Sequence, residues 1–124
     1  MAKTTAKHFE IFKLECEKWI EVLGLKDWSV WYYHGGGLAD CLASIKALVS
    51  SRVISIFLAK DWGDNEITEF QLKKTAFHEV SHILLVKLEC LGKARTTFDS
   101  EIDEEAHSII RTLENTLFVP RMNP

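Results

Sequence analysis

The chain has few cysteines, and none of them forms a C-x-x-C pair. Cys16, Cys41 and Cys90 are far apart in the sequence and odd in number. This pattern predicts neither a disulfide framework nor a zinc site built on cysteine pairs. We therefore expect the three cysteines to behave as small buried apolar residues.

Long apolar runs and an excess of basic charge are also missing. No stretch approaches the roughly 18–20 apolar residues of a membrane-spanning helix, and residues 1–5 lead into an amphipathic segment and not into a signal-peptide core. The net charge is −3, so the chain as a whole is not attracted to phosphate backbones. We expect a cytoplasmic protein that does not use a membrane or nucleic acid as its main partner.

The hydrophobic pattern predicts one α+β domain over residues 1–124, in the order helix, three-stranded sheet, helix, helix. Apolar residues at helical spacing predict a first helix over 6–23. Aromatic and β-branched residues predict a strand over 27–33, and two further segments, 39–48 and 52–58, predict a hairpin. The alanine-rich first arm of that hairpin is also compatible with a helix.

The most informative segment is residues 78–82, which read H-E-V-S-H. They lie inside a helical pattern that starts after Thr68, a suitable N-cap, and continues to about Leu88, with Gly92 at the expected C-terminal position. Residues four apart share one face of a helix, so both imidazoles of an H-E-x-x-H motif can bind one metal ion. The glutamate beside them can hold a water molecule and accept its proton.

The motif therefore predicts His78 and His82 as zinc ligands and Glu79 as a general base. Apolar neighbours such as Phe77 and Val80 indicate that both imidazoles are largely buried. The alternative is a pair of core histidines bonded to backbone carbonyls. A catalytic zinc takes three protein ligands and one water, so a third ligand has to come from elsewhere in the chain.

We expect this third ligand in a last helix over 100–117, which carries an apolar stripe and follows a short loop. Ser100 is the expected cap of this helix. His107 is the preferred ligand, because histidine is the commonest metal ligand in proteins. Asp103 and Glu105 flank the stripe and remain alternatives, and Asp103 could also orient the His107 imidazole.

This order of elements around H-E-x-x-H resembles a minimal zincin metallopeptidase, similar to small phage-type, SprT-like and ImmA/IrrE-type enzymes. In the ImmA/IrrE type a glutamate three residues before an alanine supplies the third ligand, and Asp103 before Ala106 holds that position here. The SprT-like pattern uses a third histidine, which would be His107. The resemblance implies a zinc-dependent endopeptidase whose protein or peptide substrate adds to an edge strand, which we expect to be 52–58.

Four further residues are candidates for binding the substrate. Tyr32 or Tyr33 could stabilise an oxyanion, and Arg95 or Arg111 could bind a carboxylate. Packing and solvation explain these residues equally well. The small size of the chain also favours a second interpretation, in which a peptidase-like fold serves as a regulatory or binding module with little or no turnover.

Overall fold

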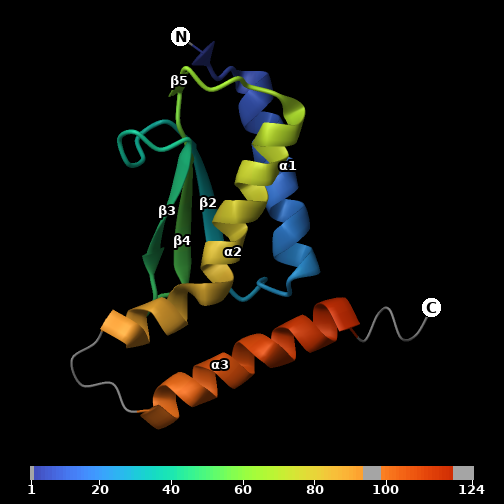
Figure 1. Ribbon diagram of the computed structural model, residues 1–124, viewed down its shortest axis with the longest axis vertical. Coiled ribbons are helices and arrows are strands. Elements are labelled where there is room, and N and C mark those ends of the chain that lie inside the picture. Colours follow the sequence, from blue (N-terminus) through green and yellow to red (C-terminus); the bar gives the residue numbers. More distant parts are fainter. Residues whose placement is uncertain (1, 94–98, 119–124) are drawn as a thin grey trace.

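The computed structural model describes residues 2–93 and 99–118, and its three helices and small sheet confirm the α+β class (Figure 1). The elements in chain order are β1 (Ala2–Lys3), α1 (Ala6–Val22), β2 (Ser29–His34), β3 (Ala43–Leu48), β4 (Val53–Leu58), β5 (Asp61–Gly63), α2 (Glu69–Lys93), α3 (Asp99–Leu113) and a π-helical turn at Glu114–Phe118.

The main sheet has three strands in the order β2-β4-β3. β4 runs parallel to β2 and antiparallel to β3, so the expected hairpin is confirmed and its first arm is a strand, not a helix. β4 is paired on both sides, and the expectation that 52–58 forms an edge strand is therefore wrong. The free edges belong to β2 and β3. A separate two-stranded sheet pairs β1 with β5 in antiparallel orientation.

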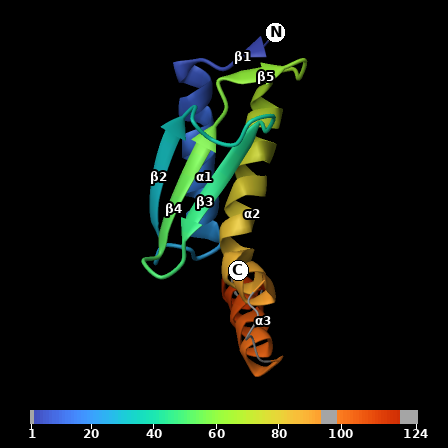
Figure 2. The same cartoon turned by 90° about the vertical axis from the view of Figure 1, so that its left-hand side faces the viewer.

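Both long helices cover the same face of the sheet (Figure 2). Three side chains of β4, Ile54, Ile56 and Leu58, are fully buried on this face. They belong to one core cluster with Phe12 of α1 and Ala76 of α2. α2 packs along α1 and also contacts β3. The core packing therefore fixes the rotation of α2 about its own axis. This rotation determines which side of α2 faces the core and which side faces β3.

Both long helices begin with a threonine cap. The Thr5 hydroxyl accepts from the backbone N–H of His8, whose Nδ1 accepts from the backbone N–H of Thr5. Thr68 Oγ1 accepts from the backbone N–H of Gln71, which confirms Thr68 as the N-cap of α2. α2 continues past Gly92, so this glycine lies inside the helix and does not end it.

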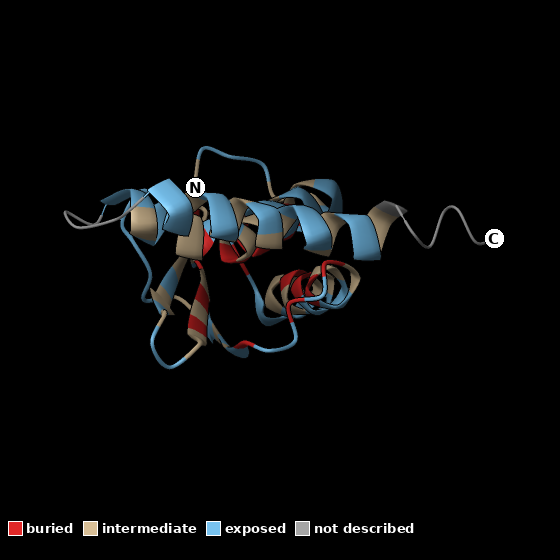
Figure 3. Cartoon of the chain, turned by 90° about the horizontal axis from the view of Figure 1, so that it is seen from below, coloured by how far each residue is buried: buried red, intermediate tan, exposed pale blue. Residues whose placement is uncertain are grey.

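α3 crosses the end of the other elements and presents mostly exposed residues (Figure 3). None of its residues, all of which are described, is buried. A methyl group added at Gly24 would lie 3.2 Å from Cγ2 of Thr116, so the end of this segment sits against the connection between α1 and β2. α3 begins at Asp99, which places Ser100 in its first turn and not at its cap.

Candidate metal centre

The two motif histidines are placed as a chelating pair on α2. Their Nε2 atoms are 3.3 Å apart, and their ring planes are inclined by 73°. Two nitrogen ligands of a tetrahedral zinc ion, each at about 2.0–2.1 Å from the metal, are separated by about 3.3 Å. His78 and His82 therefore have the separation of two corners of a zinc tetrahedron.

Both imidazoles are open to solvent, which contradicts their expected burial. His78 is exposed, and 42% of the His82 side chain is exposed. The inward face of α2 is formed by Val80 and Ile83 instead, and Phe77 is 43% exposed. The alternative of two core histidines is therefore wrong, because the helix directs its apolar residues and its imidazoles to different sides.

Glu79 lies between these two sides of the helix and is only 6% exposed. Burial raises the pKa of its carboxyl, and the neighbouring His78 and His82 oppose this shift. None of the hydrogen bonds and ion pairs among the described residues involves this carboxylate, and no described side-chain oxygen is both fully buried and without a partner, so the Glu79 oxygens reach the groove. A carboxyl with a raised pKa can both accept and release a proton closer to neutral pH.

A groove runs between α2 and the free edge of β3. It consists of two adjoining hollows of about 390 and 340 Å³ that share Cys41, Ala43, His78 and Glu79. The first hollow also includes His82 and Glu89 of α2, and Ile45 and Ala47 of β3. The motif therefore faces a strand edge that has no partner within the described residues.

Glu89 is a site residue that the sequence analysis missed. Its Oε1 lies 3.5 Å from Nδ1 of His82. A proton held on Nδ1 by this carboxylate leaves the lone pair on Nε2, the nitrogen that faces His78. The signal in the sequence is the spacing of seven residues, which puts Glu89 two turns after His82 on the same face.

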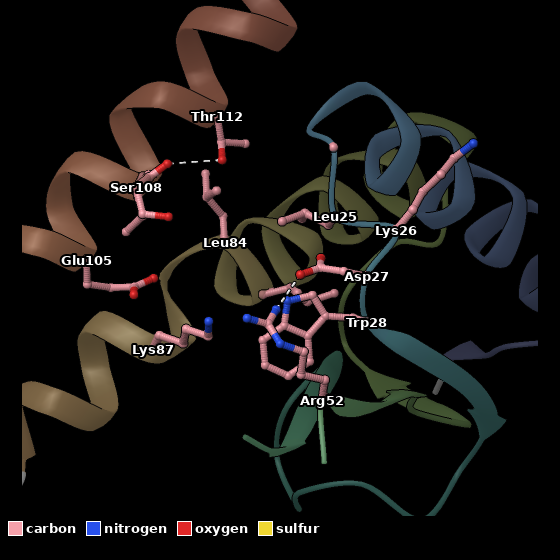
Figure 4. A pocket seen from close by; sticks show the side chains of 13 residues that line it. Leu25, Lys26, Asp27, Trp28, Arg52, Leu84, Lys87, Glu105, Ser108 and Thr112 are labelled. Carbon is pink, nitrogen blue, oxygen red and sulfur yellow. Dashed lines mark hydrogen bonds and ion pairs between the residues drawn. The ribbon is translucent and has the colours of Figure 1, made fainter. Parts of the chain in front are cut away.

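The structure does not bring His107 to the motif. The His107 side chain is exposed, and its Nδ1 donates to the Asp103 carbonyl at 2.7 Å. Neither residue lines the groove. Glu105 extends instead into a separate pocket of about 290 Å³ between α3 and the core, which Lys87 also lines (Figure 4). The reason is the placement of α3, which lies against the α1–β2 connection.

No three His, Cys, Asp or Glu side chains converge as a metal site within residues 2–93 and 99–118. The remaining positions of the chain carry none of these four residue types. The structure thus gathers His78, His82 and Glu79, while the third ligand remains a prediction.

The tyrosine and arginine candidates also lie away from the groove. Tyr33 stacks on Phe57 on the outer face of the sheet, with ring centroids 5.2 Å apart, and Tyr32 is half-buried with Lys13 over its ring. Arg111 is exposed on α3, and Arg95 lies outside the described residues. None of the three described side chains lines the groove.

Comparison with protein-family models, curated proteins and solved structures finds no match for this chain. Among the described helices, none is both long and apolar enough to cross a membrane. The resemblance to zincins therefore rests on the motif and on its geometry.

Proposed function

We propose that the protein is a zinc-dependent endopeptidase in which His78 and His82 bind the metal and Glu79 is the general base. The observation that carries this proposal is the 3.3 Å separation of the two Nε2 atoms beside a buried carboxylate. Both features face a groove that is open to solvent along a strand edge.

A bound zinc ion would act as a Lewis acid, lowering the pKa of a water molecule and polarising the scissile carbonyl. The chain's own part in the reaction is proton transfer. The Glu79 carboxylate accepts a proton from the attacking water and then donates it to the leaving amine. Burial of Glu79 favours its protonated form and so holds the proton between these two steps.

An extended peptide fits the groove by pairing with the free edge of β3. The unpaired backbone groups of an edge strand bind another strand readily. Ala43, Ile45 and Ala47 face the helical side of the sheet, as their register with β4 shows. The two alanines leave space between β3 and α2, so a peptide on this edge would pass His78 and Glu79.

Zinc content and proteolysis test the proposal. We expect about one zinc per wild-type chain, and its loss in His78→Ala and His82→Ala. Glu79→Gln should keep the metal but cleave a denatured protein substrate about 10²–10⁴-fold more slowly. Glu66→Gln, at an exposed position before α2, is the matched control and should behave as wild type. A folded wild-type protein that binds no zinc would refute the proposal.

A peptidase-like binding module is the second candidate. The position of His107 favours this candidate, because His107 is bonded to Asp103 and does not line the groove. His78 and His82 are the described histidines that line it, and a catalytic zinc needs a third protein ligand. In that case the wild type should bind peptides along β3 without cleaving them. Glu79→Gln would then leave peptide binding unchanged and have no turnover to lose.

A further inference from the structure

The two hollows of the groove differ in chemistry. The hollow of about 390 Å³, on the side of His82, carries apolar residues of both walls, among them Ile45 and Val86. The hollow of about 340 Å³ is lined on its helical wall by polar residues from the first two turns of α2. The motif stands where the two hollows adjoin. A substrate chain that passes the motif would therefore meet a different environment on each side of the bond to be cleaved.

The polar residues of the smaller hollow are Gln71, Lys74 and Thr75, and together they form a set of hydrogen-bond donors. Residues three and four apart are neighbours on one face of a helix, so an amide, an ammonium and a hydroxyl adjoin here. Within the described part of the chain, none of these three side chains takes part in a hydrogen bond or ion pair. The neighbouring Lys73, in contrast, pairs with Glu69 at 3.1 Å.

Lys74 gives the smaller hollow a positive charge. No other lysine or arginine among the described residues lines either hollow. The wall opposite Lys74 is uncharged and includes Cys41, which is exposed, as is Cys90, so the expected burial of these two cysteines is wrong. The acidic residue of this hollow is Glu79, which forms no ion pair with Lys74. A carboxylate complements the positive charge and accepts hydrogen bonds from all three donors.

The direction of the strands predicts which part of a substrate reaches Lys74. β3 and α2 run the same way along the groove, because Ala43 lines both hollows and Ala47 lines only the one with His82 (Figure 2). A peptide paired with β3 in the more stable antiparallel sense would run from the His82 end to the Lys74 end. Lys74 precedes His78 by four residues, a rise of about 6 Å, which an extended chain covers in about two residues.

We propose that Gln71, Lys74 and Thr75 bind a carboxylate of the substrate about two residues after the scissile bond. This site rests on the proposed peptidase function and gives its substrate class, which is a peptide with a carboxylate at that position. The carboxylate belongs either to an acidic side chain or to the end of the substrate chain. Lys74 would pair with it, while the Gln71 amide and the Thr75 hydroxyl would donate hydrogen bonds to its oxygens.

A synthetic peptide library with randomised central positions and an amidated C-terminus tests the site in the presence of zinc. Mass spectrometry of the products should show that Asp or Glu two residues after the cleaved bond raises the wild-type cleavage rate about 2–5-fold over Asn or Gln. This preference should shrink at high salt. Lys74→Arg should keep the preference, and Lys74→Glu should replace it with a preference for Lys or Arg.

Lys73→Glu is the matched control, because it makes the same change in charge at the next residue, which does not line the groove. This variant should keep the wild-type preference. Circular dichroism should show the same helix content in both glutamate variants, because Lys73 and Lys74 are exposed. A second library with a free C-terminus distinguishes the two sources of the carboxylate. Faster cleavage confined to the last two or three residues of this library assigns the site to the chain terminus.

The outcomes separate the carboxylate site from the proposed function. Cleavage without a preference after the bond, or with a preference that survives Lys74→Glu, would overturn the site and leave the peptidase standing. If nothing is cleaved, retention of library peptides on the immobilised wild type gives a second readout. Acidic peptides held by the wild type and lost by Lys74→Glu would support the site and refute the peptidase. Neither cleavage nor retention would refute both.

Discussion

Replacing Glu79 by glutamine should stabilise the metal-free protein although it removes the proposed general base. Only 6% of the Glu79 residue is exposed, and no hydrogen bond among the described residues reaches its carboxylate. No described side-chain oxygen is both fully buried and without a partner, so the carboxylate oxygens reach the groove. A charged group that is partly withdrawn from water in this way costs about 1 kcal/mol, the lower end of the range for an unsatisfied polar group. Glutamine has nearly the same shape and no charge, so it should recover about 1 kcal/mol of unfolding free energy. With an unfolding entropy of about 0.26 kcal/mol/K for 124 residues, Tm should rise by roughly 4 °C.

The stabilisation should depend on pH with a definite sign. Burial raises the pKa of folded Glu79 above the value of 4.5 that it has when unfolded. Between these two values the folded wild type binds a proton that the unfolded chain does not, so the wild type gains stability as the pH falls. Glutamine does not titrate. The difference in Tm should therefore be largest above the raised pKa and should shrink as the pH approaches 4.5.

Differential scanning calorimetry in the presence of a chelator measures both effects. Glu89→Gln is the matched control, because its carboxylate lines the same groove but is 44% exposed. This control should not raise Tm, which separates the burial of Glu79 from the simple loss of a negative charge. A Glu79→Gln protein with an unchanged or lower Tm, or with a Tm difference that is independent of pH, would refute the reasoning.

Two other predictions concern the neighbourhood of single side chains. Glu89→Gln should weaken zinc binding by about 10-fold, because the Glu89 carboxylate holds the proton on Nδ1 of His82. A competition assay with a chromophoric chelator measures this zinc affinity. An unchanged affinity would exclude the orienting role of Glu89. Burial, with Lys60 and His8 nearby, lowers the pKa of His34 below its ordinary value of 6.5. As the pH falls, the unfolded chain therefore binds a proton at this position before the folded chain does. The unfolding free energy should decrease as the pH falls below about 6.5. Urea titrations of wild type and His34→Gln over this range should show a smaller slope in the variant, and equal slopes would contradict the assignment.

The helices and the hairpin could be predicted because their signals are local. Apolar spacing marked α1 and α2, and Thr68 marked the start of α2 as observed. The error was to take the last strand of the hairpin as an edge, because the parallel pairing of β4 with β2 cannot be read from the local sequence.

The position of His107 could not be predicted because it depends on contacts between distant segments. The stripe on α3 predicted a helix that packs on the core, but not the direction in which it crosses. That direction is set where Thr112 and Thr116 meet Gly24, about ninety residues earlier in the chain.

The burial of Glu79 follows from the spacing of the motif itself. On a helix, the side chain of residue 79 is flanked by those three before and four after it, which are Ala76 and Ile83. Both are core residues, with exposures of 0% and 2%. Relative to residue 79, the imidazoles at 78 and 82 are rotated by about 100° and about 60° to the groove side. Because His78 and His82 face the groove while Ala76 and Ile83 face the core, Glu79 lies at the boundary between the groove and the core. The same geometry that makes this carboxylate costly to fold raises its pKa toward the range in which it can both accept and return a proton.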